Sequence, residues 1–117
     1  MTVLIVDDHR SFRRLAARML TAAGLTVVGE AEDAAAALRE AGALRPDVVL
    51  LDIVLPDCSG LHVAEQLRRA PSPPRVVLTS SRSQSDFGAG FRWPEGCTFI
   101  PKHQLTVASL NAALAVS

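Results

Sequence analysis

Short apolar runs alternate with amphipathic stretches along the whole chain, and this alternation limits the folds that the chain can adopt. Five runs rich in β-branched residues recur along the sequence: Val3–Val6, Thr26–Gly29, Val48–Leu51, Val76–Thr79 and Thr98–Ile100. Their nearly continuous apolar character is typical of strands that are buried on both faces of a sheet. The sequence therefore predicts five strands of a parallel sheet.

The stretches between these runs have helical periodicity. We expect helices at Ser11–Ala23, which ends at Gly24, at Ala34–Ala41, which follows a capping Asp33 and ends at Gly42, at Leu61–Arg69, and after a capping Thr106. On the first helix, one apolar face carries Phe12, Leu15, Ala16, Met19 and Leu20. Alternating strands and helices predict an α/β fold: a doubly wound parallel sheet with helices on both faces and right-handed crossovers.

One connection departs from this regularity. Between Thr79 and Phe99 the chain is rich in serine and glycine, which are poor helix formers, and it also contains Pro94. We expect the fourth helix, which would lie within this segment, to be irregular or short.

Length and charge narrow the class of protein. A chain of 117 residues corresponds to one domain, and twelve acidic side chains balance twelve basic ones. We therefore expect residues 1–117 to form a single domain that does not bind nucleic acid or membranes directly. No apolar run approaches the roughly 20 residues of a membrane span, and the N-terminus leads directly into a strand, so we expect a cytoplasmic location.

Cysteines and histidines do not predict a second site. Cys58 and Cys97 form no CxxC pair and are expected to be free thiols. His9, His62 and His103 have no mutual spacing that is typical of metal ligands, and we expect them on the surface.

Charged residues follow three of the apolar runs, at the point where each run ends. Asp7 and Asp8 follow the first run, Asp52 follows the third, and Lys102, the only lysine in the chain, follows the fifth. Lysine is a compact charge on a flexible stem, which arginine does not replace in a small site. Ligands of doubly wound sheets bind at the carboxyl ends of the strands. These residues, together with Thr79 at the end of the fourth run, therefore predict one site.

The residue types at this site indicate its chemistry. Three neighbouring carboxylates repel one another unless a cation lies among them, and oxygen ligands favour a hard divalent ion such as Mg²⁺. Asp8 and Asp52 are the expected direct ligands, and Asp7 binds directly or through water. A carboxylate can also attack phosphorus. Lys102 and Thr79 would then stabilise the charge on the phosphoryl oxygens.

Four short motifs together resemble a known family. They are Leu4–His9, Leu50–Asp52 followed by Pro56 and Gly60, Val77–Ser80 and Phe99–Lys102. With these motifs the sequence resembles the receiver domain of bacterial two-component response regulators over essentially its whole length. It is most similar to the receivers that are usually fused to a helix-turn-helix DNA-binding domain.

The resemblance implies a flavodoxin-like fold with strand order 2-1-3-4-5 and a role for each matching residue. Asp52 would be the phosphoacceptor. The carboxylates of Asp7 and Asp8 and the backbone carbonyl of Val54 would hold Mg²⁺ beside it. The domain would catalyse only its own phosphorylation and dephosphorylation.

The resemblance also implies a conformational switch and partners. Thr79 would be the switch hydroxyl and Phe99 the switch aromatic, and phosphorylation would remodel the surface of helix 4, strand 5 and helix 5. The phosphodonor would be a sensor histidine kinase, a phosphotransfer protein or a small molecule. Homodimerisation is compatible with this reading, and the chain is either a stand-alone receiver or the receiver of a longer regulator.

Two other classes of protein share parts of the pattern. A Mg²⁺-dependent phosphohydrolase would also use an aspartyl nucleophile, but it commonly needs a second aspartate two residues later, where this chain has Val54. A flavodoxin-like cofactor binder would need a phosphate-binding loop after the first strand, where Asp7 and Asp8 would repel a phosphate.

Overall fold

The predicted sheet is present. The computed structural model describes residues 1–82, 87 and 93–114, and its five parallel strands lie in the order β2-β1-β3-β4-β5. The strands are β1 (Thr2–Val6), β2 (Thr26–Ala31), β3 (Val48–Asp52), β4 (Arg75–Thr79) and β5 (Cys97–Phe99). The helices are α1 (Arg10–Ala22), α2 (Ala34–Leu44), α3 (Gly60–Arg68) and α4 (Val107–Leu114), with a 3-10 turn η2 (Lys102–Gln104). Both the fold class and the strand order agree with the prediction.

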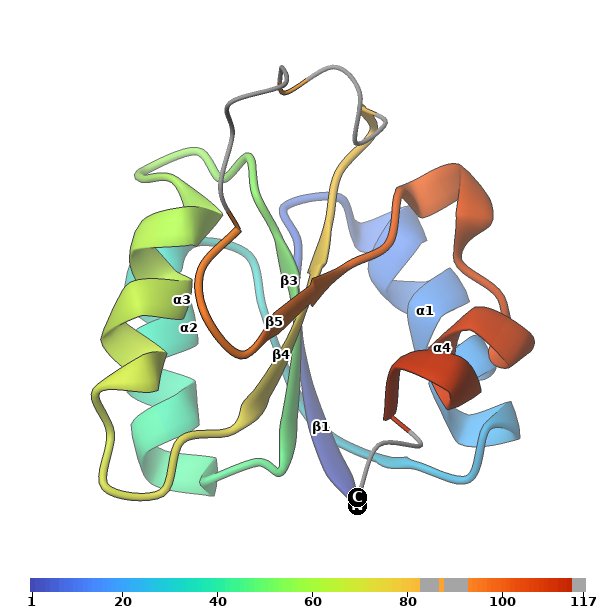
Figure 1. The fold of residues 1–117 in the computed structure, drawn as a ribbon, viewed down its shortest axis with the longest axis horizontal. Helices are drawn as coiled ribbons and strands as arrows, with labels where there is room; N and C mark the ends of the chain where they lie inside the picture. The colour runs from blue at the N-terminus through green and yellow to red at the C-terminus, as the bar shows by residue number, and fades with distance from the viewer. Residues whose placement is uncertain (83–86, 88–92, 115–117) are drawn as a thin grey trace.

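The helices form two layers, one on each face of the sheet. Figure 1 shows α2 and α3 on one face and α1 and α4 on the other. Leu4, Val6, Val49 and Leu51 are buried in the core under α2 and α3, and the alternate residues of the same strands are buried under α1 and α4. The runs of β1 and β3 are therefore continuously apolar because both faces of these strands are buried, as the sequence predicted. The prediction was wrong for the two edge strands: in β2 only Ala31 is buried, and in β5 no residue is buried.

Two helices differ from the sequence prediction in one respect each. Helix α2 does not end at Gly42 but continues to Leu44, and it ends where Arg45 adopts a left-handed conformation with φ 47° before Pro46. Gly42 is tolerated inside the helix, whereas the residue before a proline disfavours helical geometry. On α1, Leu15 is 49% exposed and is not part of the buried face that periodicity assigned to it.

Side-chain caps fix the starts of α2 and α4 as predicted. Asp33 accepts a hydrogen bond from the backbone N–H of Ala36 at 2.7 Å. At the start of α4, Thr106 Oγ1 accepts one from the N–H of Ser109 at 3.0 Å. The expected irregular fourth helix falls largely on residues 83–86 and 88–92, which lie outside the described residues. Within residues 1–82, 87 and 93–114, no helix is both long and apolar enough to cross a membrane.

Candidate functional site

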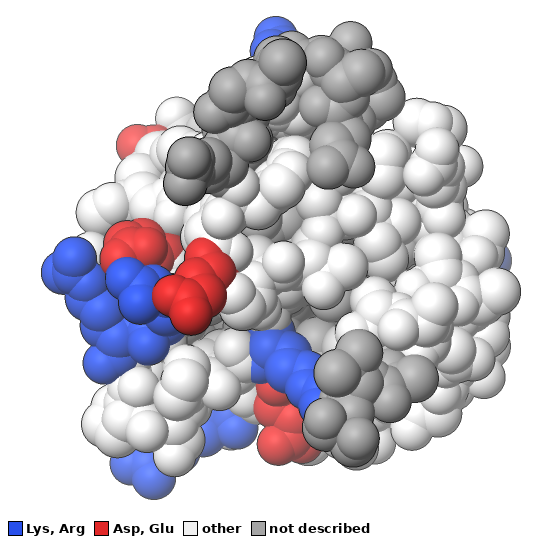
Figure 2. All heavy atoms as spheres, in the orientation of Figure 1, with Lys and Arg blue, Asp and Glu red and all other residues white. Residues whose placement is uncertain are grey.

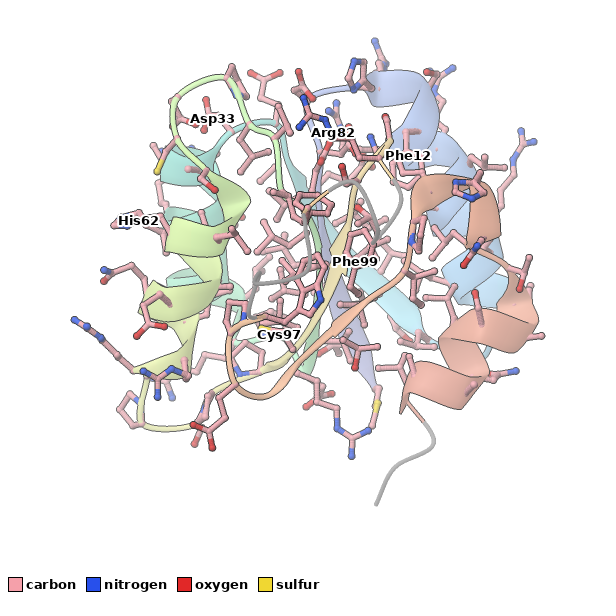
Figure 3. The ribbon with its side chains drawn as sticks, turned by 45° about the horizontal axis from the view of Figure 1, so that its top comes forward. Phe12, Asp33, His62, Arg82, Cys97 and Phe99 are labelled. Atoms are coloured by element: carbon pink, nitrogen blue, oxygen red, sulfur yellow. The ribbon has the colours of Figure 1, made fainter. Side chains whose placement is uncertain are left out.

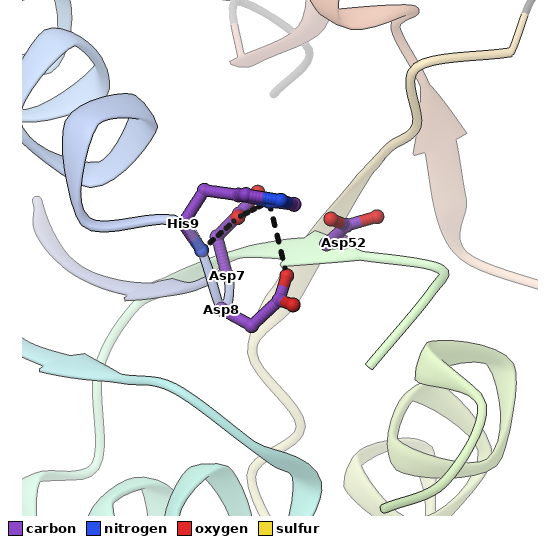
Figure 4. Close-up of side chains that lie close together, drawn as sticks. All are labelled: Asp7, Asp8, His9 and Asp52. Atoms are coloured by element: carbon purple, nitrogen blue, oxygen red, sulfur yellow. Dashed lines mark hydrogen bonds and ion pairs between the residues drawn. The ribbon is translucent and has the colours of Figure 1, made fainter. Parts of the chain in front are cut away.

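The carboxyl ends of the strands bring the predicted residues to one edge of the sheet. Asp52 is the last residue of β3 and pairs in register with Thr79, the last residue of β4. Asp7 and Asp8 directly follow β1. One carboxylate oxygen from each of the three aspartates and a ring nitrogen of His9 all lie within 4.8 Å of one another (Figure 4).

Lys102 connects two of these carboxylates. Its Nζ donates a hydrogen bond to Asp52 Oδ2 at 3.0 Å and forms an ion pair with Asp7 Oδ2 at 2.7 Å. The backbone holds the residue in place, because the N–H of Lys102 donates to the carbonyl of Ser80 at 2.9 Å. Burial lowers the pKa of Lys102, but its hydrogen bonds to Asp7 and Asp52 outweigh burial and raise it. The ammonium is therefore charged at neutral pH.

Asp52 lies in the interior, where a charge is costly. Its side chain is 5% exposed, and Oδ1 accepts a hydrogen bond from the backbone N–H of Val54 at 3.0 Å. Burial raises the pKa of Asp52, and the charge of Asp7 adds to this, whereas the bonds from Val54 and Lys102 oppose it. A buried carboxylate with a raised pKa in a cluster of charges is typical of a functional group.

Asp7 and Asp8 differ in exposure. The side chain of Asp7 is 1% exposed, and its Oδ1 accepts from the backbone N–H of His9 at 2.8 Å. The side chain of Asp8 is 36% exposed. The His9 ring lies on the surface as expected, but its Nδ1 also lies 3.2 Å from Asp7 Oδ1 and 3.1 Å from Asp8 Oδ1. Sequence spacing could not predict this, because the contact depends on the turn between β1 and α1.

The donor set fits a hard divalent cation. Asp7, Asp8 and Asp52 supply carboxylate oxygens on one side of the edge, and two of these groups are buried against a single ammonium. Three negative charges near one positive charge leave the cluster with an excess of negative charge, which a cation would neutralise. Carboxylate oxygens with access to water on the side of Asp8 are the ligands that Mg²⁺ prefers.

The two predicted switch residues lie in different surroundings. Thr79 is fully buried, and its Oγ1 has no hydrogen-bond partner among the described residues. Phe99 is half-buried, and its ring stacks on Trp93 with centroids 4.4 Å apart, while Phe87 contacts both rings edge to face. An unpaired buried hydroxyl is unusual, and here it belongs to the residue that pairs in register with Asp52 in the adjacent strand.

The loop after β3 is held close to the site. Gly60 donates its N–H to the carbonyl of Ile53, and a Cβ at this position would overlap the carbonyl oxygen of Asp52. Asp57 accepts from the N–H groups of Ala34 and Ala35 at 2.8 and 3.0 Å, so the loop also caps α2, and these bonds lower the pKa of Asp57. The requirement for glycine at position 60 is steric.

Two residues of helix α1, Arg13 and Phe12, make contacts that sequence reasoning missed. Arg13 donates to the backbone carbonyl of Asp7 at 2.6 Å and to Glu30 Oε1 at 2.8 Å. Lys102 Nζ lies over the ring of Phe12, 4.4 Å from its centroid. Periodicity placed Phe12 on the buried face of the helix but could not predict its contact with Lys102. The only available signal was its position in the first helical turn after Asp7 and Asp8.

Comparisons with known proteins agree with the geometry. Residues 3–113 match the family model of the response regulator receiver domain. The chain is 43% identical over 83 residues to the transcriptional regulatory protein NarL of Mycobacterium tuberculosis, covering 70% of this chain and 38% of NarL. It is 42% identical over 83 residues to a protein-glutamate methylesterase/protein-glutamine glutaminase of Myxococcus xanthus, covering 70% of this chain and 24% of that protein.

A solved receiver structure shows the same fold. The CheY-like receiver domain from Methylobacillus flagellatus is 26% identical, with a TM-score of 0.82 over 98% of this chain and 96% of that one. The chain spans only 24% and 38% of the lengths of these two relatives. It spans 96% of the Methylobacillus flagellatus receiver domain. The chain therefore belongs to the response regulator receiver domains of two-component systems.

Proposed function

We propose that this receiver domain accepts a phosphoryl group on Asp52. The observation that carries the proposal is the buried Asp52 carboxylate, with Lys102 Nζ at 3.0 Å, two further aspartates within the same cluster and the unpaired Thr79 hydroxyl in the next strand. A carboxylate is a competent nucleophile toward phosphorus, and the surrounding groups match the charge that the reaction creates.

In the proposed step, an Asp52 carboxylate oxygen forms a bond to phosphorus. The bond between phosphorus and the leaving atom of the donor breaks, and the leaving group keeps that electron pair. The Lys102 ammonium, which is hydrogen-bonded to Asp52 Oδ2, turns to a phosphoryl oxygen. The backbone N–H of Val54 continues to donate to the other carboxylate oxygen, Oδ1. The Thr79 hydroxyl, which has no hydrogen-bond partner among the described residues, would donate to the new phosphoryl group.

Mg²⁺ is the proposed cofactor. Asp7, Asp8, Asp52 and the backbone carbonyl of Val54 would hold it, and when bound it would neutralise charge on the phosphoryl oxygens. The acidic cluster of the first three residues supports the proposal, and the carbonyl of Val54 is added from the family resemblance.

We further propose that Thr79 and Phe99 transmit phosphorylation to a partner surface. This surface comprises β5, α4 and the segment between β4 and β5. Figure 2 shows that, on the described part of this face, uncharged residues predominate around β5 and α4, which suits contact with a protein. The signal would come from a sensor histidine kinase or phosphotransfer protein, and the response would be binding of an output partner or homodimerisation.

The chain is proposed to act as one cytoplasmic signalling domain, residues 1–117, without DNA binding of its own. Relatives that carry an enzymatic name, such as the methylesterase, are longer proteins that share only this region. A phosphohydrolase function has no support in the site, because Val54 stands two residues after Asp52 and cannot transfer a proton.

The direct test is phosphorylation by acetyl phosphate in the presence of Mg²⁺. We expect intact-protein mass spectrometry to show the addition of one phosphoryl group to the wild type and none to Asp52→Asn. Asp47→Asn is a matched control. Asp47 lies at the amino end of β3, opposite the strand ends that carry the site, and accepts a hydrogen bond from the N–H of Thr2. Equal labelling of Asp52→Asn and the wild type would refute the assignment.

A further inference from the structure

Phe12 lies where the first turn of α1 meets the site. It is half-buried and packs against the core under α1 and α4. Figure 3 shows it at the end of α1 that faces the strand ends. Lys102 Nζ lies over the face of its ring, 4.4 Å from the centroid, which is within the roughly 6 Å range of a cation–π interaction.

The Lys102 ammonium is therefore surrounded by three groups. Asp7 Oδ2 and Asp52 Oδ2 approach it at 2.7 and 3.0 Å, and the Phe12 ring covers a further side. The Lys102 side chain is 15% exposed, so little of it remains in contact with water. A flexible four-carbon stem would otherwise allow the ammonium several positions.

We propose that Phe12 is a positioning residue that holds the Lys102 ammonium in place for phosphorylation of Asp52. The inference rests on the proposed function, because it concerns the role of Lys102 in that reaction. An aromatic face stabilises a cation without adding a negative charge. A third carboxylate would also hold the ammonium, but it would repel the incoming phosphoryl group. The ring can keep its contact while the ammonium turns from Asp52 to a phosphoryl oxygen.

A purely structural role for Phe12 makes a different prediction. If the ring only fills the core, then Phe12→Leu, which keeps an apolar side chain of similar size, should preserve the site. If the aromatic face matters, Phe12→Leu should impair it and Phe12→Tyr should preserve it. Leu15→Ala is the control on the same helix, because Leu15 is 49% exposed.

The first readout is the position of Lys102 in the unphosphorylated protein. Because the chain has a single lysine, labelling with ¹³C-lysine gives side-chain NMR signals from Lys102 alone. Protons over an aromatic face are shifted upfield by its ring current. We expect upfield-shifted Lys102 Hε signals in the wild type and Phe12→Tyr, and signals close to those of free lysine in Phe12→Leu.

The second readout is the rate of phosphorylation by acetyl phosphate with Mg²⁺. We expect Phe12→Leu to lower the maximal rate about five-fold, in keeping with the strength of a cation–π contact. The acetyl phosphate concentration at half-maximal rate should change little, and Phe12→Tyr should restore the rate. Thermal melts establish that each variant is folded, and Phe12→Met replaces Phe12→Leu if the latter is not.

The outcomes separate the two proposals. Absence of wild-type phosphorylation would overturn the proposed function, whereas the NMR readout would still report on the Phe12–Lys102 contact. A wild-type rate together with unchanged Lys102 signals in Phe12→Leu would overturn the positioning role. Equal losses in Phe12→Leu and Phe12→Tyr would also overturn it, because they would indicate packing and not the aromatic face.

Discussion

At the scale of single residues, the site has more buried negative charge than positive charge. Asp7 and Asp52 are almost fully buried and share the ammonium of Lys102. Burial and the neighbouring Asp7 raise the pKa of Asp52, so the folded protein holds this proton more tightly than the unfolded chain does. Ionisation of Asp52 at neutral pH therefore costs the folded state free energy. The proposed phosphoacceptor role of Asp52 and the stability of the fold are therefore in conflict.

This conflict predicts that Asp52→Asn stabilises the protein at pH 7 in the absence of divalent ions, by on the order of 1 kcal/mol. The variant leaves one buried carboxylate, Asp7, beside the Lys102 ammonium. The gain should shrink as the pH falls below the raised pKa, because Asp52 is then protonated in the wild-type fold as well. Thermal melts in EDTA from pH 4 to 8 measure this, and a variant that is less stable at every pH would contradict it.

The sequence predicted these residues because each lies at or shortly after the carboxyl end of a strand, and these ends meet at the same side of a parallel sheet. The positions of Asp7, Asp8, Asp52 and Lys102 thus follow from local pattern and topology together. The contacts of Phe12 and His9 could not be predicted in this way. They depend on how α1 leaves β1, and helical periodicity specifies only which face is buried.

At the scale of elements, the loop between β3 and α3 holds the start of α3 against the carboxyl end of β3, next to Asp52. Asp57 joins this loop to the first turn of α2, and Gly60 lets the start of α3 contact the end of β3. The sequence marked Gly60 as part of a motif but could not show that its reason is steric. Similarly, Gly42 looked like a helix end, although Arg45 and Pro46 end α2 three residues later.

The two glycines give a matched prediction. Gly60→Ala should destabilise the protein by about 2 kcal/mol or more and slow the phosphorylation of Asp52, because the new methyl group overlaps the Asp52 carbonyl. Gly42→Ala should be neutral or stabilising by up to about 1 kcal/mol, because the position is helical and, in the described part of the chain, nothing beyond the adjacent residues and the backbone of α2 lies within 4 Å of the new Cβ. Urea unfolding of both variants measures this, and equal effects would contradict it.

At the scale of the whole molecule, the proposed phosphorylation site and the proposed partner surface lie in different places, so the proposed signalling requires that the two be coupled. Thr79 lies at the strand ends, and Phe99 lies on β5 within a group of three aromatic rings with Phe87 and Trp93. Most of the segment between β4 and Trp93 lies outside the described residues, so its part in the proposed partner surface stays a prediction. A movement of Phe99 would change its ring contacts with Phe87 and Trp93.

Trp93 offers a direct measurement of this coupling, because it is the only tryptophan and stacks on Phe99 at 4.4 Å. Phosphorylation should shift its fluorescence to longer wavelength, since a displaced Phe99 ring exposes the indole to water. Asp52→Asn treated with the same phosphodonor should show no shift, and Thr79→Ala should be phosphorylated with a smaller shift. An unchanged emission spectrum in fully phosphorylated wild type would show that Phe99 does not move.

The single lysine also has a practical consequence. Apart from the terminal amine of Met1, which lies at the opposite edge of the sheet, the only primary amine among the 117 residues is in the cluster of aspartates. Dyes, cross-linkers and sensor chips that couple through amines would therefore either attach at the N-terminus or disable the site. Attachment through the N-terminus alone keeps the aspartate cluster open to the solvent and to any phosphodonor.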